Sequence, residues 1–401
     1  MGIGTVHHLS TLPPLYCLLG RHPLRWAVKP AIRGVRWPGK WRSRRFPLPW
    51  SSFPVHSESP SATKKEILED EISRATLLWR AAKLPIYSVA LVGYAAAYLQ
   101  TGLFSPGRYL LLLLSSCLII AWLNLSNDVY DHDTGVDQNK RESVVNILGR
   151  HALKSSTVSY SNNFLFFYAN ATYCLRSQRA AHLASIVSLV LGLAGVMWAF
   201  VDIGDIRFIL LITSAILCGY VYQFPPLRLS YHGLGEPLCF AAFGPFATTA
   251  FYFSQYSKNL ASGIHHLPLN RTSLSASVLV GLTTTFILFC SHFHQIDGDK
   301  EVRKMSPLVR VGTEMGSKLI KIGILMLYTF LLGFSICKAL PLTCALFCLG
   351  TLPIAKQVVD FVERNHNDKV KIFMAKYYCV RLHALFGAAL AVGLVVARGR
   401  F

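Results

Sequence analysis

The stretch "YLLLLLSSCLIIAWLNLSNDVYDHDTGVD", residues 109–137, joins an apolar run to a cluster of acidic side chains. The apolar part, 109–125, is long enough to cross a bilayer as a helix. The side chains of Asn124, Asn127, Asp128 and Asp131 follow at i, i+3, i+4 and i+7, a spacing that places all four on one helix face. A membrane-spanning helix is therefore expected to end in a polar stripe.

The whole chain has the composition of a membrane protein. Of its 401 residues, 52% are hydrophobic and 15% are charged, whereas soluble domains carry about 25% charged residues. Apolar runs predict an all-α protein with about nine transmembrane helices: 84–100, 109–125, 181–200, 207–223, 234–253, 276–293, 319–337, 340–356 and 382–397. The net charge of +20 does not indicate a nucleic-acid partner, because the basic residues lie in a leader and in alternate loops. The ten cysteines are scattered without zinc spacing and are interpreted as packing residues.

Residues 1–57 differ from the rest of the chain. They contain nine Lys or Arg, no Asp or Glu, and no apolar core of the kind a secretory signal needs. This pattern favours an organelle transit peptide, with chloroplast the first interpretation and mitochondrion the second. A polar N-terminal segment, 58–76, and a membrane domain, 77–401, are expected to follow. Within that domain, 151–177 lacks clear periodicity. We interpret it as an insertion, which is either intron sequence translated in a gene model or a disordered or surface loop.

A second polar stripe ends the sixth predicted span, in "CSHFHQIDGDKEVRK", residues 290–304. The side chains of His292, Gln295 and Asp299 follow at i, i+3 and i+7, and Asp297 is close by. Counting spans places both stripes at the same membrane boundary. The loops on that side hold most of the basic residues, which marks it as the side that is not translocated, the stroma in a chloroplast.

The two stripes together indicate a particular chemistry. Carboxylates gathered in one site repel unless positive charge compensates them, and carboxylate and amide oxygens are suitable ligands for Mg²⁺ that also binds substrate phosphates. Basic side chains near the stripes would contact the rest of a phosphate-bearing ligand: Lys140, Arg141, Arg303, Lys304 and Arg310. A site with Mg²⁺, phosphate and a lipid-facing cavity is typical of isoprenoid diphosphate chemistry.

Both stripes resemble motifs of a known family. The stretch "NDVYDHDTGVD" is similar to the first aspartate-rich motif of the UbiA superfamily of intramembrane prenyltransferases. The stretch "HFHQIDGDKEVRKMSPLVRVGT" resembles the second motif of its MenA-type 1,4-dihydroxy-2-naphthoate branch, in the plant and cyanobacterial form.

The resemblance implies nine helices around a central cavity and dependence on Mg²⁺. It also implies transfer of a phytyl chain from phytyl (prenyl) diphosphate to 1,4-dihydroxy-2-naphthoate, with loss of carbon dioxide and pyrophosphate, in phylloquinone biosynthesis. The expected location is a chloroplast membrane, envelope or thylakoid, with the site facing the stroma. Membrane lipid surrounds such a protein, and no obligate protein partner follows from the sequence.

The resemblance also implies roles for individual residues. The metal ligands would be Asp128, Asp131, Gln295 and Asp299. The diphosphate would be bound by Asn127, Lys140, Arg228, Lys304 and Arg310. Asp131 and Asp137 are the candidate catalytic residues, Asp137 as the base near the ring hydroxyl. Three positions depart from the family pattern: Arg303 replaces a glycine, Met305 replaces a basic residue, and Gln295 stands where many relatives carry Asp, with Asp297 as a possible substitute ligand.

Other interpretations remain open at this point. Arg228 would serve equally well as a basic anchor at the membrane surface, and Glu236 is favoured at a helix start by the helix dipole. His292 and His294 do not share a helix face, which favours interfacial hydrogen bonding. For the whole chain, the alternatives are a homogentisate-type or chlorophyll-type prenyltransferase, an ion-coupled transporter, and a structural membrane protein.

Overall fold

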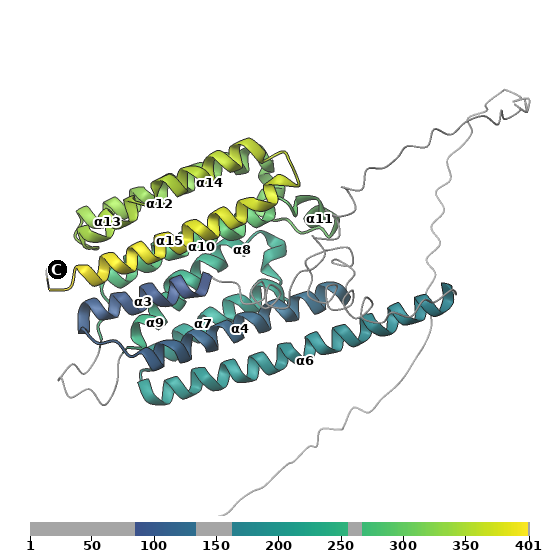
Figure 1. The fold of residues 1–401 in the computed structure, drawn as a ribbon, viewed down its shortest axis with the longest axis horizontal. Coiled ribbons are helices and arrows are strands. Elements are labelled where there is room, and N and C mark those ends of the chain that lie inside the picture. The colour runs from purple at the N-terminus through teal and green to yellow at the C-terminus, as the bar shows by residue number, and fades with distance from the viewer. Residues whose placement is uncertain (1–84, 134–162, 256–266, 400–401) are drawn as a thin grey trace, which may run out of the picture. The chain divides into compact units, whose positions relative to one another are not determined.

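A computed structural model describes residues 85–133, 163–255 and 267–399 (Figure 1). Every regular element in these ranges is a helix, as the apolar runs predict. The expected transit peptide, the polar segment 58–76 and the start of the membrane domain at 77 lie outside the described residues. All described residues belong to one unit, Lys65–Phe401.

The predicted spans correspond to helical stretches. The first five comprise α3 (Pro85–Thr101), α4 (Pro106–Asp133), α6 (Asn163–Ile203), α7 (Ile206–Gln223), the short turn η1 (Leu229–His232), and a run made of α8 (Gly235–Ala241), the π-helical η2 (Ala242–Thr248) and α9 (Thr249–Phe253). The last four comprise α10 (Arg271–His292), α11 (Ile296–Glu301), α12 (Pro307–Ile336), α13 (Leu342–Leu349), α14 (Leu352–Asn365), η3 (Lys371–Met374) and α15 (Ala375–Val396).

Six of the described helices are long and apolar enough to cross a membrane, and α13 with α14 would make a seventh span bent by 49°. The remaining two predicted spans are α3, which has only 17 residues, and the α8–η2–α9 run, which is broken by the π-helix around Pro245. Proline removes a backbone donor and clashes with the preceding turn, so a distortion at this point is expected.

Helix α6 differs from the sequence-based expectation. We expected 151–177 to be a surface loop, but α6 begins at Asn163, so 163–177 continues the third span as helix. A loop is therefore wrong for 163–177, whereas 151–162 lie outside the described residues and the insertion stays a prediction. The stretch "NFLFFYANATYCL" contains an apolar run and no proline or glycine, so nothing in it interrupts a helix that is already formed by the following residues.

Helix α3 packs against α10, α15 and the η2–α9 segment. Small residues allow this close approach, as in many membrane helix pairs. A Cβ added at Gly93 would lie 2.5 Å from the Thr248 carbonyl oxygen and 2.7 Å from Phe251 Cβ. The buried His383 of α15 fastens the same helices: its Nδ1 lies 2.8 Å from the Thr283 hydroxyl and its Nε2 lies 2.9 Å from the Pro85 carbonyl oxygen.

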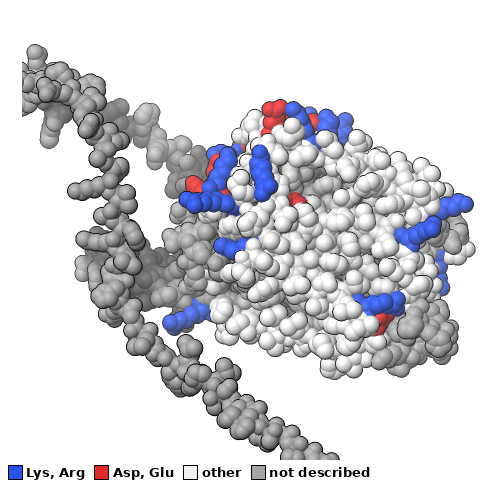
Figure 2. Space-filling model, turned by 180° about the vertical axis from the view of Figure 1, so that it is seen from behind, with Lys and Arg blue, Asp and Glu red and all other residues white. Residues whose placement is uncertain are grey.

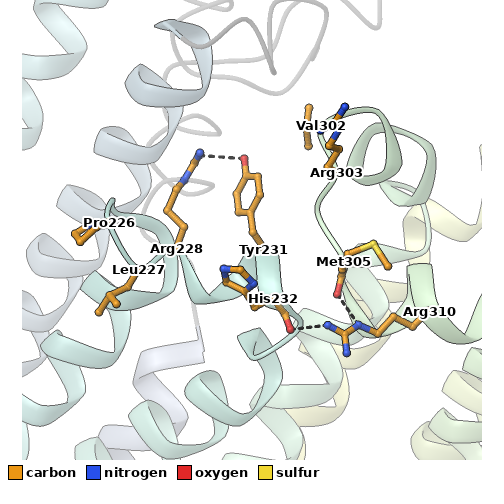
Figure 3. A pocket seen from close by; sticks show the side chains of 9 residues that line it. All are labelled: Pro226, Leu227, Arg228, Tyr231, His232, Val302, Arg303, Met305 and Arg310. Atoms are coloured by element: carbon orange, nitrogen blue, oxygen red, sulfur yellow. Dashed lines mark hydrogen bonds between the residues drawn. The ribbon is translucent and has the colours of Figure 1, made fainter.

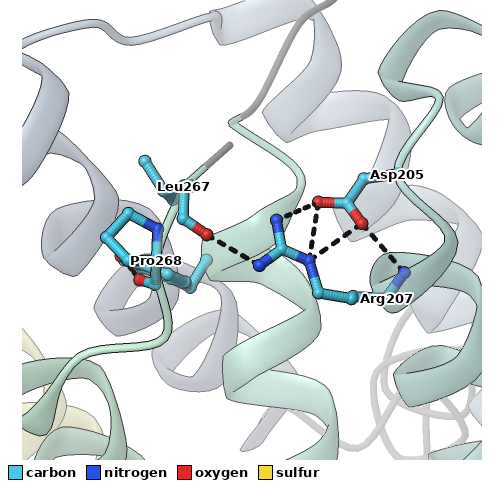
Figure 4. A network of polar contacts seen from close by, with 5 residues as sticks. Asp205, Arg207, Leu267 and Pro268 are labelled. Atoms are coloured by element: carbon cyan, nitrogen blue, oxygen red, sulfur yellow. Dashed lines mark hydrogen bonds and ion pairs between the residues drawn. The ribbon is translucent and has the colours of Figure 1, made fainter. Parts of the chain in front are cut away.

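On the face drawn in Figure 2, Lys, Arg, Asp and Glu side chains gather in separate groups with a large uncharged area between them. One end of the helices is stabilised by an ion pair and by hydrogen bonds around it (Figure 4). The Asp205 carboxylate caps α7 by accepting from the Arg207 backbone N–H at 2.9 Å, and it also pairs with the Arg207 guanidinium at 2.6 Å. Arg207 donates a further bond to the Leu267 carbonyl oxygen at 2.8 Å. These bonds stabilise the ends of the helices that lie farthest from the two polar stripes.

Candidate active site

The turn after α7 is the element around which the candidate site is built. Helix α7 ends at Gln223, just before Pro225 and Pro226, as the double proline predicts. Arg228 then adopts a left-handed backbone conformation with φ of 39°. Gly233 ends η1 with φ of 75°, and a Cβ at that position would lie 2.8 Å from the Met305 carbonyl oxygen. Glycine is therefore required there, both for the turn and for the approach of the neighbouring loop.

This turn contacts the end of α4, which carries the first polar stripe. The Phe224 ring stacks on Trp122, with ring centroids 5.8 Å apart, and the Gln223 side chain donates to the Leu123 carbonyl oxygen at 2.5 Å. Asn127 lies about one turn further along α4, and the helix continues to Asp133. The first stripe therefore begins beside the turn that carries Arg228.

The same turn is bonded to the loop that carries the second motif. The Met305 backbone N–H donates to the Tyr231 carbonyl oxygen at 2.9 Å. The Arg310 guanidinium donates to the carbonyl oxygens of His232, at 2.8 Å, and of Met305, at 3.2 Å. Both motif-bearing segments thus adjoin one turn, at one end of the helices. This agrees with the expectation that the two stripes lie at the same boundary.

A cavity of about 500 Å³ lies between the turn and the second-motif loop (Figure 3). The turn contributes Pro226, Leu227, Arg228, Tyr231 and His232, and the loop contributes Val302, Arg303, Met305 and Arg310. Three arginines and no acidic residue line the cavity, so among the described residues it has a strongly positive wall. The Arg228 guanidinium lies 4.1 Å from the Tyr231 ring centroid and donates to the Tyr231 hydroxyl at 3.0 Å. Such a cavity is suited to an anion attached to an apolar or aromatic body.

Asp299 has the environment of a cation ligand. Its side chain is buried, and one carboxylate oxygen lies 3.1 Å from the Lys304 ammonium. The other oxygen, Oδ2, is buried and has no hydrogen-bond partner among the described residues. Buried carboxylate oxygens are rarely left without a partner, so this atom fits a site that binds a metal ion. Gln295, one turn earlier, supplies the backbone carbonyl that accepts from the Asp299 N–H at 2.8 Å.

The structure describes the side chains of only some of the predicted site residues. Side chains of Asp128 and Asp131 are not described, although α4 extends through both positions, and Asp137 and Lys140 lie outside the described residues. Arg228 and Arg310 line the cavity, and Lys304 pairs with Asp299. Within the described part of the chain, no group of three His, Cys, Asp or Glu side chains could hold a metal. A complete metal site would therefore require the residues of the first stripe.

Asp297 does not join Asp299 in the structure. Its side chain is exposed and forms an ion pair with Lys369 from the loop before η3. The hydrogen bond from Lys369 holds the pKa of Asp297 below its usual range. This places Asp297 on the outer surface of α11, away from the role of substitute ligand that the sequence suggested, because alternate residues of a helix point in different directions.

The structure adds two features to those that the sequence indicates. Arg303 lines the cavity with a left-handed backbone, φ of 57°. Glu236 and His292, which we interpreted as a dipole-favoured residue and an interfacial group, are both buried and lie 3.1 Å apart. Glu236 lies in the first turn of α8, as the helix dipole favours, and its carboxylate oxygens accept no hydrogen bond from any described residue. The sequence named Arg303 as a basic residue near the site but not its backbone conformation, and no local pattern links positions 236 and 292.

Comparisons with known proteins agree on one family. Residues 175–380 match the UbiA prenyltransferase family. The chain is 55% identical to the 2-carboxy-1,4-naphthoquinone phytyltransferase, chloroplastic, of Arabidopsis thaliana over 349 residues, which are 86% of this chain and 84% of the relative. It is 37% identical to the 2-carboxy-1,4-naphthoquinone phytyltransferase of Synechocystis over 324 residues, 79% of this chain and 92% of the relative. A solved UbiA homologue from Archaeoglobus fulgidus aligns with 78% of the chain and 98% of its own, with a TM-score of 0.46 and 15% identity.

Proposed function

This chain belongs to the UbiA prenyltransferase family, and on that premise we propose that it transfers a phytyl chain from phytyl diphosphate to a 2-carboxylated naphthalene ring. Pyrophosphate and carbon dioxide are the other products, and the reaction belongs to phylloquinone biosynthesis. The observation that carries the proposal is the 55% identity to the Arabidopsis phytyltransferase over 86% of this chain. The proposed location is a chloroplast membrane with the site facing the stroma, supported by that relative's chloroplastic name and by the apolar helices.

The oxidation state of the acceptor ring is a separate question. The two relatives are named for the quinone, 2-carboxy-1,4-naphthoquinone, whereas the sequence analysis expects the quinol, 1,4-dihydroxy-2-naphthoate. Departure of pyrophosphate leaves an allylic cation, which needs an electron-rich carbon to attack it. Two hydroxyl groups enrich the quinol ring, and two carbonyl groups deplete the quinone ring. We therefore propose the quinol as the form that reacts.

We call the part of the site that would bind Mg²⁺ and the diphosphate of the phytyl donor the donor end. We propose Asp128, Asp131, Gln295 and Asp299 as the metal ligands, supported by the buried and unpartnered Oδ2 of Asp299. When bound, the ion would neutralise charge on the diphosphate as it departs. The diphosphate would be bound by Asn127, Lys140, Arg228, Lys304 and Arg310. Lys304 is already held within 3.1 Å of Asp299, so a small side-chain movement would bring it to a phosphate oxygen next to that ligand.

Besides binding the diphosphate, Arg310 would hold two segments of the site together. Two of its nitrogens donate to the carbonyl oxygens of His232 and Met305. These bonds fix the second-motif loop against the turn that carries Arg228. A shift of about 1 Å between two such segments is enough to slow a reaction that depends on positioning.

The bond changes at the acceptor balance without a redox step. The ring carbon that carries the carboxylate forms a bond to the first carbon of the phytyl chain, while the neighbouring hydroxyl gives its proton to a base and becomes a carbonyl. The carboxylate then leaves as carbon dioxide, and its bonding electrons restore the aromatic ring as the oxygen regains a proton. We propose Asp137 as the base.

The test is a direct competition between acceptors. Purified protein in lipid vesicles would receive Mg²⁺, phytyl diphosphate and equal amounts of 1,4-dihydroxy-2-naphthoate and homogentisate under anaerobic conditions. The proposal predicts a phytylated naphthoquinol and almost no phytylated homogentisate. A parallel reaction with 2-carboxy-1,4-naphthoquinone tests the oxidation state, because faster turnover of the quinone would contradict the assignment of the quinol.

A further inference from the structure

Arg303 occupies an unfavourable backbone conformation. Its φ of 57° lies in the left-handed region, which residues other than glycine adopt only at an energetic cost. Glycine, which has no Cβ, would accept such a φ without strain. Side chains retained in this conformation cluster at functional sites. The arginine side chain at 303 therefore calls for an explanation that packing alone does not provide.

The other charged groups in the cavity already have partners. The Arg310 guanidinium is bonded to two backbone carbonyl oxygens, and the Arg228 guanidinium is bonded to the Tyr231 hydroxyl. Lys304, next in sequence to Arg303, is paired with Asp299. Arg303 is exposed at the cavity wall and forms no ion pair with any residue that the structure describes. Among the described residues that line the cavity, it is the cation most available to a ligand.

The proposed reaction requires positive charge at a second place besides the diphosphate. The attacked ring carbon also carries the carboxylate, and it must come within about 3–3.5 Å of the first carbon of the phytyl chain. The acceptor carboxylate therefore lies close to the diphosphate, and the two anions repel each other. A cation reserved for the carboxylate would offset this repulsion and orient the ring.

We propose, on the basis of the function proposed above, that Arg303 binds the carboxylate of the acceptor and so determines the specificity for a carboxylated ring. Lys304 faces Asp299 and the donor end, and Arg303 lines the neighbouring cavity, so adjacent residues of one loop serve the two anions. A guanidinium binds a carboxylate through two parallel hydrogen bonds. The Tyr231 ring and the Leu227 and Met305 side chains in the same cavity suit an aromatic body.

Because Arg303 has a left-handed backbone, the substitution Arg303→Gly separates an effect on function from an effect on folding. Glycine removes the guanidinium and also relieves the strain at φ of 57°, so loss of folding would not explain a loss of function. The proposal predicts that the KM for 1,4-dihydroxy-2-naphthoate rises about tenfold or more, the size expected when one charged hydrogen bond is lost. The KM for phytyl diphosphate should stay within about twofold of wild type. Arg303→Lys keeps the charge and should recover part of the effect.

Binding of unreactive analogues separates the carboxylate from other causes. The dissociation constant of 1-hydroxy-2-naphthoate should rise about tenfold in Arg303→Gly, whereas that of 1-naphthol, which lacks the carboxylate, should not change. An increased KM for phytyl diphosphate alone would overturn the proposal by assigning Arg303 to the donor. Unchanged constants for both substrates would overturn it as well. Either result leaves the proposed function intact, because wild-type turnover of the naphthoate is measured in the same experiment.

Discussion

Replacement of Asp299 by Asn probes the proposed metal site with the smallest change in shape. The substitution removes one negative charge from a buried position whose Oδ2 has no partner and whose Oδ1 lies 3.1 Å from Lys304. We expect turnover to fall about a thousandfold, or about 4 kcal/mol in the activation free energy, because a neutral amide offers less charge to the ion.

The same substitution affects stability through Lys304. At 3.1 Å and an effective dielectric constant of about 20, the attraction between Asp299 and Lys304 is about 5 kcal/mol before the cost of desolvation. Most of that attraction is offset by burial, but a buried ammonium left alone is costly. The Lys304 side chain retains 16% exposure and would relax toward water, so we expect a loss of about 2 kcal/mol in the free energy of unfolding.

Two measurements separate these effects. Thermal unfolding in detergent, with and without Mg²⁺ and pyrophosphate, reports ligand binding apart from turnover, since a ligand at 100 times its Kd stabilises by about 2.7 kcal/mol. Wild type should show this stabilisation, and Asp299→Asn should lose it. The matched control is Asp299→Asn with Lys304→Met, which should regain stability without regaining activity. An Asp299→Asn protein that keeps more than about a tenth of wild-type turnover, a loss under about 1.4 kcal/mol, would refute direct metal ligation.

Three further predictions concern single residues. Gln295→Ala should reduce turnover less than Asp299→Asn does, because a neutral ligand compensates less charge, and equal losses in the two variants would contradict this ranking. Arg310→Met should lower kcat/KM about tenfold by freeing the second-motif loop, because the two lost hydrogen bonds are exposed and contribute about 0.5–1.5 kcal/mol each. Arg310→Lys should be less affected, and an Arg310→Met enzyme with normal kcat/KM would show that these bonds do not position the site. Asp205→Ala, at the opposite end of the helices, should lower the free energy of unfolding by about 2 kcal/mol, because a helix cap and an ion pair are lost. It should leave kcat unchanged, and a large fall in kcat would show that the two ends of the helices are coupled.

The helices could be predicted because their signal is local. Long apolar runs require a membrane, and the membrane requires helices, since every backbone group must be satisfied within the chain. The end of α7 at Gln223 followed from the two prolines in the same way. The start of α6 could not be predicted in this way, because Asn163–Arg176 lacks an amphipathic pattern and yet extends the helix.

The contacts that build the site could not be predicted, because they join distant parts of the chain. Nothing in the sequence near Tyr231 indicates that its carbonyl oxygen accepts from Met305, or that Glu236 lies beside His292. Resemblance to a family motif did place Asp299 and Lys304 in one motif, and the structure pairs them. The sequence also marked Arg303 as unusual, but its significance depends on a backbone angle and a cavity that only the fold provides.

The central claim is that prenyl transfer takes place at the carbon that carries the carboxylate. It is tested most directly with 1,4-dihydroxy-2-naphthoate labelled with ¹⁴C in the carboxylate, by counting released carbon dioxide against pyrophosphate in the presence of Mg²⁺ and phytyl diphosphate. The account predicts one carbon dioxide for each pyrophosphate and a phytylated naphthoquinol without label. Pyrophosphate release with the label retained in the product would place the new bond at another carbon and contradict the account.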